Sequence, residues 1–508
     1  MRNLIRAALL AGLMTAMPLA GLAAQPSADA VALEIKAQAD GRLKPVYAMR
    51  GFWPLWVKDG ALSAAAPTLL GYLETAEVDG LNPSDYDVRD LKRLLDEARS
   101  GDPRQLARAE LKLSQAFARY VRDVRRAPNA QIRYLDEELR PRKLAEDDVL
   151  RAAAVAPDFN AYVANMGWMN PAYAGIRQLM TARGEQWSKL PSNWVPEGPA
   201  LKPGMSGDRV WSLRERLGLD PMGKFDKTVA EVLRRFQTAH GLKADGVAGA
   251  GTVAALNRPP DWYDRKIAQN LDRARALPGP GTRHIIVNTA AQQLHYYAEG
   301  AEAGRMRVVV GKPDQQTPML AGMMRFATLN PYWNVPDDLA HKRVVSRVIG
   351  GASLQRLGFE ALSGWEADAQ LLQPSQIDWQ AVSDGRQRIR VRQLPGPDNA
   401  MGRVKFMFPN DLGIYLHDTN EPELMARSAR FFSSGCVRLE DAQRLGEWLF
   451  GQPLSASTGA PEQHVPLPKP VPVYLTYLTV QPLAGGGVQF LEDVYGRDEI
   501  DPREFASR

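Results

Sequence analysis

The chain has 508 residues, of which 63 are Lys or Arg and 58 are Asp or Glu, so its formal net charge is only +5. This weak balance gives no support for a nucleic-acid-binding protein, and no basic run with interleaved aromatic residues is present. With 45% hydrophobic residues, the chain can form several cores. Its length of roughly 480 residues after a candidate leader suggests two to four domains.

Residues 1–24 have the features of a secretory signal peptide. Arg2 and Arg6 form a basic start, a long apolar run follows, and Ala23-Ala24 offers a cleavage site. The run is short for a membrane span, which needs about 20 apolar residues, although an uncleaved anchor stays open. We expect export, and no second apolar run is long enough to cross a bilayer.

Residues 25–200 are expected to form a helical scaffold domain that begins with a loose, Ala-rich leader up to residue 40. Apolar residues recur at spacings of three and four within 90–95 and 111–118. The aromatic residues of this region are interpreted as packing residues, and no catalytic constellation is found in it.

Residues 204–257 are predicted to form a module of three short helices, the second capped by Asp226 and ended by Gly241. The module resembles the peptidoglycan-binding domain 1 family through Gly207-Asp208-Arg209-Val210, Gly223-Lys224-Phe225-Asp226 and Asp245-Gly246-Val247, with Arg214 where many members have Gln. The resemblance implies binding to the cell wall. A brace between neighbouring domains is the alternative.

Residues 258–281 are expected to form a connecting helix and a Pro/Gly linker. Short β-branched and aromatic runs then predict a β-rich domain over 282–496, followed by a tail over 497–508. The mixed stretch 338–400 interrupts this domain. An insertion of that length beside a candidate site is often a lid, so we expect an inserted capping subdomain. The predicted fold class is multidomain α+β.

Cys436 is the only cysteine of the chain. In an exported protein cysteines usually pair as disulfides, so a single one is either reactive or an inert buried residue. His417 lies nineteen positions upstream at the end of a strand-like run. A thiol beside an imidazole can serve as a nucleophile, and we predict that these two form the catalytic pair.

Neighbouring residues are candidates for supporting roles. Gly435 and the N–H groups of residues 435 and 436 are candidates for the oxyanion site. Arg438 could lower the thiol pKa or grip a substrate carboxylate, with a surface arginine as the alternative. Tyr415 should share a strand face with His417 and line the cleft.

The stretch from His417 through Ser433-Ser434-Gly435-Cys436-Val437-Arg438 is similar to the signature of the L,D-transpeptidase (YkuD-like) family. Ser434 stands where that family usually has a second His. This departure resembles the large Gram-negative periplasmic branch. Further agreement comes from Val310-Gly311-Lys312-Pro313, Thr317-Pro318 and Asn330-Pro331-Tyr332-Trp333-Asn334. Ser434, Trp333 and Asn334 are therefore candidate substrate-binding residues, with a packed turn as the alternative for the last two.

The resemblance implies a periplasmic enzyme that forms 3→3 peptidoglycan cross-links by thioester acyl transfer from tetrapeptide stems. It needs no cofactor and no metal, and it implies acylation by carbapenems. Peptidoglycan stem peptides are the expected substrate, and peptidoglycan glycosyltransferases or carboxypeptidases are candidate partners. Two alternatives stay open: hydrolysis, as in an L,D-carboxypeptidase or cross-link hydrolase, and a non-catalytic peptidoglycan-binding scaffold.

Overall fold

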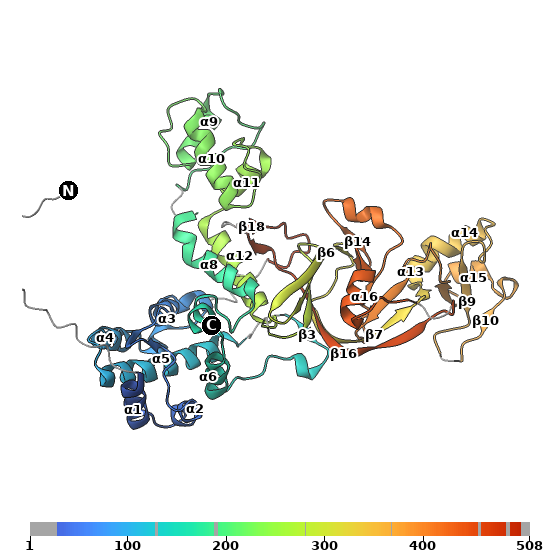
Figure 1. The fold of residues 1–508 in the computed structure, drawn as a ribbon. Helices are drawn as coiled ribbons and strands as arrows, with labels where there is room; N and C mark the ends of the chain where they lie inside the picture. The colour runs from blue at the N-terminus through green and yellow to red at the C-terminus, as the bar shows by residue number, and fades with distance from the viewer. Residues whose placement is uncertain are drawn as a thin grey trace, which may run out of the picture.

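The computed structural model describes residues 28–126, 131–186, 191–279, 281–366, 368–455, 459–483 and 488–498. The predicted signal peptide at 1–24 lies outside them. In chain order, the described residues form a helical scaffold, a three-helix module, a β-rich domain and a subdomain inserted into it (Figure 1). The fold class is therefore multidomain α+β, as predicted. None of the helices in these ranges has the length and apolar character of a membrane span.

The scaffold packs its helices around one hydrophobic cluster. They are α1 (Ala28–Gln38), α2 (Leu43–Met49), α3 (Ala65–Glu74), α4 (Val88–Ala98), α5 (Pro103–Val124), α6 (Glu146–Ala154), α7 (Phe159–Ala164) and α8 (Pro171–Gln186), with a small hairpin of β1 (Val57–Lys58) and β2 (Ala61–Leu62). The Asp102 carboxylate caps the long central helix α5 by accepting from the N–H of Gln105 at 3.0 Å.

The expectation of a loose leader up to residue 40 is wrong from residue 28 onward. Helix α1 buries Val31 and Ile35 completely and packs on α5. These two side chains are four positions apart and share one helix face. Their burial stabilises a helix that the Ala-rich composition does not reveal.

A buried ionic cluster around Asp79 connects the scaffold to the connecting helix that follows the three-helix module. Both oxygens of Asp79 accept from Nε of Arg177 at 3.0 Å, and the hydroxyls of Tyr120 and Tyr173 donate to the same carboxylate at 2.8 and 2.6 Å. Arg275 donates to the carbonyl of Asp79 at 2.8 Å from the connecting helix α12 (Pro260–Arg275). Every oxygen of this buried carboxylate is thus satisfied, as burial of a charge requires.

The module consists of α9 (Asp208–Arg216), α10 (Lys227–Ala239) and α11 (Ala250–Asn257) around a core of its own. Asp226 caps α10, as predicted, by accepting from the N–H of Val229 at 2.9 Å. Arg214 donates to the carbonyls of Asp220 and Lys224 at 2.6 and 3.0 Å, so it stabilises the turn that leads into α10.

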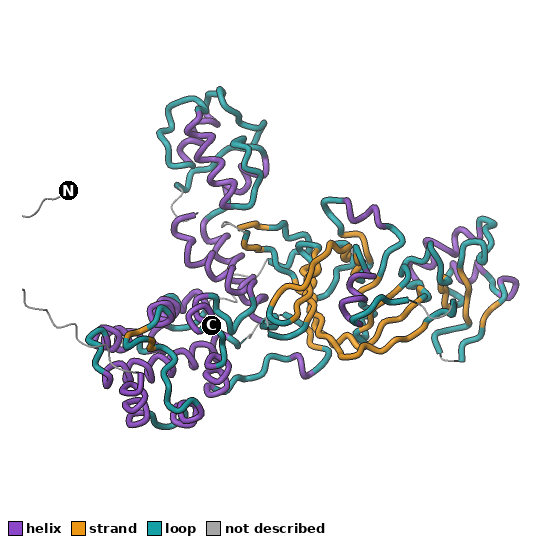
Figure 2. The backbone as a smooth tube through the Cα atoms, viewed as in Figure 1, coloured by secondary structure: helices purple, strands orange, loops and turns teal. Residues whose placement is uncertain are grey.

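The β-rich domain is a sheet that closes on itself. Its strands run in the order β12-β13-β15-β6-β5-β4-β16-β7, and β7 pairs again with β12. They are β4 (His284–Asn288), β5 (Gln293–Ala298), β6 (Ala301–Gly311), β7 (Leu320–Leu329), β12 (Val404–Met407), β13 (Leu416–His417), β15 (Val437–Leu439) and β16 (Gln463–Thr476). Strand β14 (Phe431–Ser433) pairs with β6 outside this order. Helix α16 (Ala442–Phe450) packs into the same core. Beyond β16, β17 (Val480–Pro482) and β18 (Val488–Phe490) form a separate antiparallel pair. Strand β15 pairs with β13 on one side and with β6 on the other, so the ends of the three strands lie side by side. Figure 2 shows the strands of this domain gathered together, with the helices of the scaffold to one side.

The inserted subdomain has a four-stranded sheet and a separate hydrophobic cluster. It contains β8 (Trp333–Asn334), α13 (Asp337–Ala340), a π-helical turn (His341–Val345), α14 (Ser346–Ile349), β9 (Phe359–Leu362), β10 (Leu371–Leu372), α15 (Trp379–Ser383) and β11 (Arg390–Gln393). Because β8 pairs with β11, the subdomain starts upstream of the predicted boundary at 338.

One scaffold segment joins the sheet of the β-rich domain directly. Strand β3 (Arg133–Tyr134) pairs in parallel with β7, with Arg133 opposite Leu320 and Tyr134 opposite Ala321. Asp136, just beyond it, accepts from the N–H of Met323 at 2.7 Å. The scaffold and the β-rich domain therefore share a sheet.

We predict that replacing Asp79 by Asn lowers the free energy of unfolding by about 3 kcal/mol, because it leaves the buried Arg177 without its counter-charge. Chemical denaturation monitored by circular dichroism measures the change. The matched control is Asp90→Asn, whose carboxylate lies half exposed beside Arg93 and whose loss should cost less than about 0.5 kcal/mol. Equal effects of the two substitutions would contradict the role of the Asp79 cluster.

Candidate active site

The register of two short parallel strands places the candidate pair. Strands β13 and β15 align Leu416 with Val437 and His417 with Arg438, and the N–H of Val437 donates to the carbonyl of Tyr415 at 3.1 Å. Leu416 and Val437 are fully buried in the core. Since side chains alternate along a strand, Tyr415, His417, Cys436 and Arg438 share the opposite face. One face thus carries four of the predicted site residues.

The turn before the cysteine is built from Ser433 and Gly435. Gly435 has φ +111°, a backbone conformation that residues other than glycine rarely adopt. The hydroxyl of Ser433 accepts from the N–H of Gly435 at 3.2 Å and donates to the carbonyl of Cys436 at 2.6 Å. The N–H of Gly435 is therefore engaged, which weakens its predicted role in the oxyanion site. The N–H of Cys436 has no acceptor among the described residues.

The thiol of Cys436 faces a backbone carbonyl and not the imidazole. Sγ donates to the carbonyl of Gly413 at 3.4 Å, and no hydrogen bond to the ring of His417 is present among the described residues. Burial raises the pKa of Cys436 to about 11, while the backbone of Tyr415 and the charge of Arg438 oppose that rise. The side chain remains partly accessible to solvent.

The imidazole of His417 is neutral. Burial, and then the charge of Arg438, lower the pKa of His417 to about 3. The backbone of Asp418 and of Met401 raises it slightly, although Nδ1 has no hydrogen-bond partner within the described residues. Met401 was not singled out in the sequence as a neighbour of the ring.

Arg438 forms an ion pair with Glu421, from the loop between the two candidate catalytic residues. One of its guanidinium nitrogens is therefore occupied. Its charge lowers the pKa of both His417 and Cys436. The electrostatic role predicted for Arg438 fits this position, and a grip on a substrate carboxylate would use the guanidinium edge that Glu421 leaves open.

The other predicted substrate-binding residues divide into two groups. Ser434 is exposed next to the nucleophile, and Tyr415 packs between His417, at 6.1 Å between ring centroids, and the cluster of the inserted subdomain. Trp333 is part of that cluster, and Asn334 accepts from Arg390 at 3.0 and 2.7 Å. The structure thus places Trp333 and Asn334 in packing and pairing roles, the alternative left open above.

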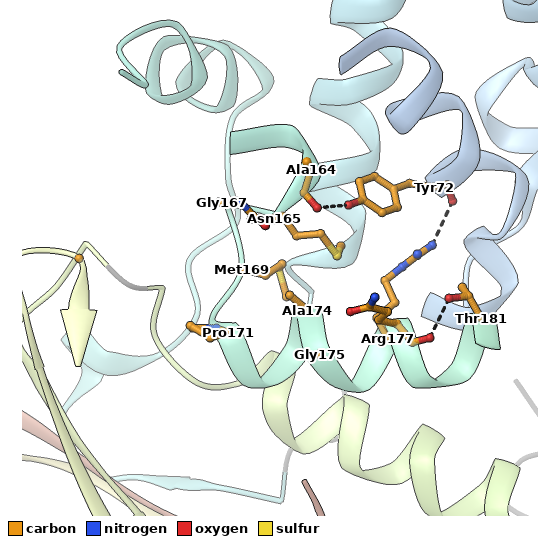
Figure 3. Close-up of a pocket in the computed structure, with 13 residues that line it drawn as sticks. Tyr72, Ala164, Asn165, Gly167, Met169, Pro171, Ala174, Gly175, Arg177 and Thr181 are labelled. Carbon is orange, nitrogen blue, oxygen red and sulfur yellow. Dashed lines mark hydrogen bonds between the residues drawn. The ribbon is translucent and has the colours of Figure 1, made fainter. Parts of the chain in front are cut away.

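A separate cavity of about 680 Å³ lies in the scaffold beside α8 (Figure 3). There the hydroxyl of Tyr72 donates to the carbonyl of Ala164 at 2.8 Å, and Arg177 donates to the carbonyl of Tyr72 at 3.2 Å. Thr181 also donates to the carbonyl of Gln178 at 2.9 Å, and the described residues that line the cavity include no Cys or His. Nor do the described residues contain a group of three or more His, Cys, Asp or Glu side chains arranged to hold a metal ion.

Several residues of the site escaped the sequence interpretation. Thr317 is fully buried and donates to the carbonyl of Gly435 at 2.7 Å. Asn410 fixes the loop that carries Gly413 by accepting from the N–H groups of Leu412 and Ile414 at 3.1 and 3.0 Å. The sequence does contain Thr317-Pro318 and turn-forming residues around Asn410. Neither pattern indicates which residue the Thr317 or Asn410 side chain bonds to.

Comparison with protein families divides the chain in the same order. Residues 282–451 match the L,D-transpeptidase catalytic domain (YkuD), residues 215–256 match a family described as "Putative peptidoglycan binding domain", and residues 41–180 match a family described as "Scaffold domain". The chain therefore contains an L,D-transpeptidase catalytic domain (YkuD) over residues 282–451 and a putative peptidoglycan-binding domain over residues 215–256.

Among curated proteins, a "Putative L,D-transpeptidase" of Haemophilus influenzae is 30% identical over 241 residues, which cover 46% of this chain and 48% of that protein. The chain thus spans about half the length of the curated relative it matches. Among solved structures, residues 123–326 of an L,D-transpeptidase from Xylanimonas cellulosilytica align at 13% identity and a TM-score of 0.16, covering 55% of this chain and 98% of that one. A fused Zn-dependent amidase/peptidase with a peptidoglycan-binding domain from Clostridium acetobutylicum aligns at 14% identity and a TM-score of 0.17, covering 55% of this chain and 100% of that one.

We predict that alkylation of Cys436 by iodoacetamide accelerates about tenfold per pH unit from pH 6 to 10 without reaching a plateau, because only the thiolate reacts. The raised pKa favours the protonated thiol in the folded state, so the thiolate fraction keeps growing toward pH 11. Mass spectrometry of the alkylated peptide gives the rate, and Arg438→Gln should slow it further because it removes a charge that favours the thiolate.

The control is the same thiol in the urea-unfolded chain, where the rate should level off above an ordinary pKa of about 8.5. A plateau of the alkylation rate below pH 8 in the folded protein would mean that a resting thiolate–imidazolium pair exists. That result would contradict the raised pKa of Cys436 and the lowered pKa of His417.

Proposed function

We propose that this chain is a periplasmic L,D-transpeptidase that forms 3→3 peptidoglycan cross-links, with Cys436 as nucleophile and His417 as general base. The observation that carries the proposal is the shared strand face of these two residues, beside an N–H of Cys436 that has no acceptor among the described residues. The match of residues 282–451 to the YkuD catalytic domain supports it.

The reaction proceeds by two acyl transfers. The sulfur attacks the carbonyl of the diaminopimelate L-centre in a tetrapeptide stem, the thiol proton passes to His417, and the carbon–nitrogen bond to D-Ala breaks. The departing amine takes the proton from His417. The side-chain amine of a second stem then attacks the thioester, loses its proton through His417 and releases the thiol.

The neutral resting pair constrains how this chemistry begins. Burial penalises a free thiolate and a free imidazolium, as the two pKa shifts indicate. Transfer of the proton within the pair leaves the net charge of the site unchanged. The thiol must first turn from the carbonyl of Gly413 toward His417. Attack then moves the negative charge onto the substrate oxygen, where the N–H of Cys436 can donate to it.

The module is proposed to hold the enzyme on the wall. A hollow of about 690 Å³ beside α11 is lined by Trp194, Glu197 and Arg258. The indole of Trp194 is 63% exposed, which is unusual for so large an apolar side chain. An exposed aromatic face flanked by charged groups suits a sugar ring that carries hydroxyl and carboxylate groups. The module also contacts β18 through His240 and Phe490, so we propose that it braces the β-rich domain as well.

We predict that purified protein incubated with tetrapeptide muropeptides releases D-Ala and produces cross-linked dimers, measured by mass spectrometry. Cys436→Ala should abolish both, and His417→Gln should reduce turnover by about 10²- to 10⁴-fold. Tripeptides without dimers would establish hydrolysis instead, and unchanged muropeptides would favour a non-catalytic scaffold. In the same assay a carbapenem is expected to acylate Cys436 and add its mass to the wild type only.

We predict that Trp194→Ala weakens co-sedimentation with purified sacculi about tenfold and leaves turnover of soluble muropeptides unchanged, because Trp194 lines the hollow beside α11 and not the candidate active site. The control is Trp53→Ala, since Trp53 is 48% exposed on the scaffold. Undiminished binding of the Trp194 variant would leave the module with the bracing role only.

A further inference from the structure

The loop from Gly311 to Thr317 lies beneath the nucleophile turn. The hydroxyl of Thr317 accepts from the N–H of Gly311 at 2.9 Å and donates to the carbonyl of Gly435 at 2.7 Å. A Cβ on Gly311 would come within 2.2 Å of the carbonyl oxygen of Gln315, so only glycine fits there. Thr317 therefore connects the end of β6 to the residue before the nucleophile.

The bond from Thr317 to Gly435 also orients the next N–H. The carbonyl of Gly435 and the N–H of Cys436 belong to one planar trans peptide, in which they point in opposite directions. Fixing the carbonyl on Thr317 consequently directs the N–H of Cys436 away from the loop. This is the donor proposed above for the substrate oxyanion.

A segment near the C-terminus clamps this loop from the other side. The hydroxyl of Tyr495 donates to the carbonyl of Gly311, and the N–H of Thr317 approaches that hydroxyl at 3.5 Å. The Tyr495 ring is buried, stacks on Tyr477 with ring centroids 5.1 Å apart, and contacts Phe431 of β14.

The two residues after the clamp extend it to the connecting helix. Arg497 donates to the carbonyl of Thr317 at 3.0 Å and to the side chain of Gln316 at 2.9 Å. Asp498 pairs with Lys266 at 3.0 Å and Arg273 at 2.6 Å, both on α12. Residues 497 and 498, predicted as part of a C-terminal tail, therefore hold the loop and α12 together.

We propose that Tyr495 is a positioning residue for the nucleophile: together with Thr317 it fixes the peptide between Gly435 and Cys436 in the orientation that catalysis needs. The inference rests on the proposed function, since it takes Cys436 as the nucleophile. Tyr495 touches neither the thiol nor the substrate. It acts through Gly311 and Thr317.

The first test compares Tyr495→Phe, which keeps the stacked ring and removes the hydroxyl, with Tyr134→Phe. The Tyr134 hydroxyl is buried without a hydrogen-bond partner among the described residues, so its removal should be silent. In the D-Ala release assay, Tyr495→Phe is expected to lower kcat about tenfold with KM within twofold, because the reacting groups are misaligned while the binding surface is intact. Thr317→Val should have the same effect, and Thr317→Ser, which retains the hydroxyl, should restore most of the activity.

The second test does not need turnover. Hydrogen exchange followed by mass spectrometry should show the amides of residues 311–317 and 433–437 exchanging at least fivefold faster in Tyr495→Phe than in the wild type or Tyr134→Phe, with the melting temperature of the folded protein nearly unchanged. Three results would overturn the proposal. They are a wild-type kcat in Tyr495→Phe, a loss of activity that only parallels unfolding of the variant, and unaltered hydrogen exchange of these amides. A wild-type enzyme without activity would refute the proposed function, and the exchange rates would still decide the positioning role.

Discussion

The pairing of β13 with β15 is the constraint on which the site depends. Each strand has only two or three residues, yet the register that buries Leu416 and Val437 also sets which side chains meet on the other face. A shift by one residue would turn Cys436 and His417 into the core and expose the leucine and valine. The burial of apolar side chains on one face thus specifies the chemistry on the other. This coupling explains how segments nineteen positions apart become one site.

The electrostatics of the site follow from the same burial. The imidazole is buried and the thiol mostly so, and burial favours the neutral form of both. The charged residues nearby, Arg438 and Glu421, pair with each other toward the more exposed rim. A neutral thiol is protected from indiscriminate reaction with small electrophiles and oxidants. Under the proposed function, reactivity then depends on a bound substrate that accepts charge at the moment of attack, which would link activity to recognition of the stem peptide.

Local signals in the sequence were enough to predict the fold class and to single out the candidate pair, which the structure brings to one strand face. Cys436 and His417 stood out because a lone cysteine and a strand-ending histidine are rare signals, and the cap at Asp226 is a local feature that needs no tertiary contact. The role of Thr317 depends on a partner more than one hundred positions away, which no local pattern encodes. The same reason explains why the helix over residues 28–38 was not predicted, since helix α1 is stabilised by its contact with α5. Trp333 could not be assigned from composition, because an aromatic turn residue serves packing and ligand binding equally well.

The strand that the scaffold contributes to the catalytic sheet affects how this protein can be divided. Residues 133 and 134 hydrogen-bond along β7 at Leu320 and Ala321, so the boundary at 282 suggested by sequence families runs through a shared sheet. A recombinant fragment that begins at 282 would leave that stretch of β7 with unpaired backbone groups, an edge open to pairing with another chain. If the β-rich domain were exchanged as a module during evolution, the short strand β3 would have to move with the closed sheet to which it belongs.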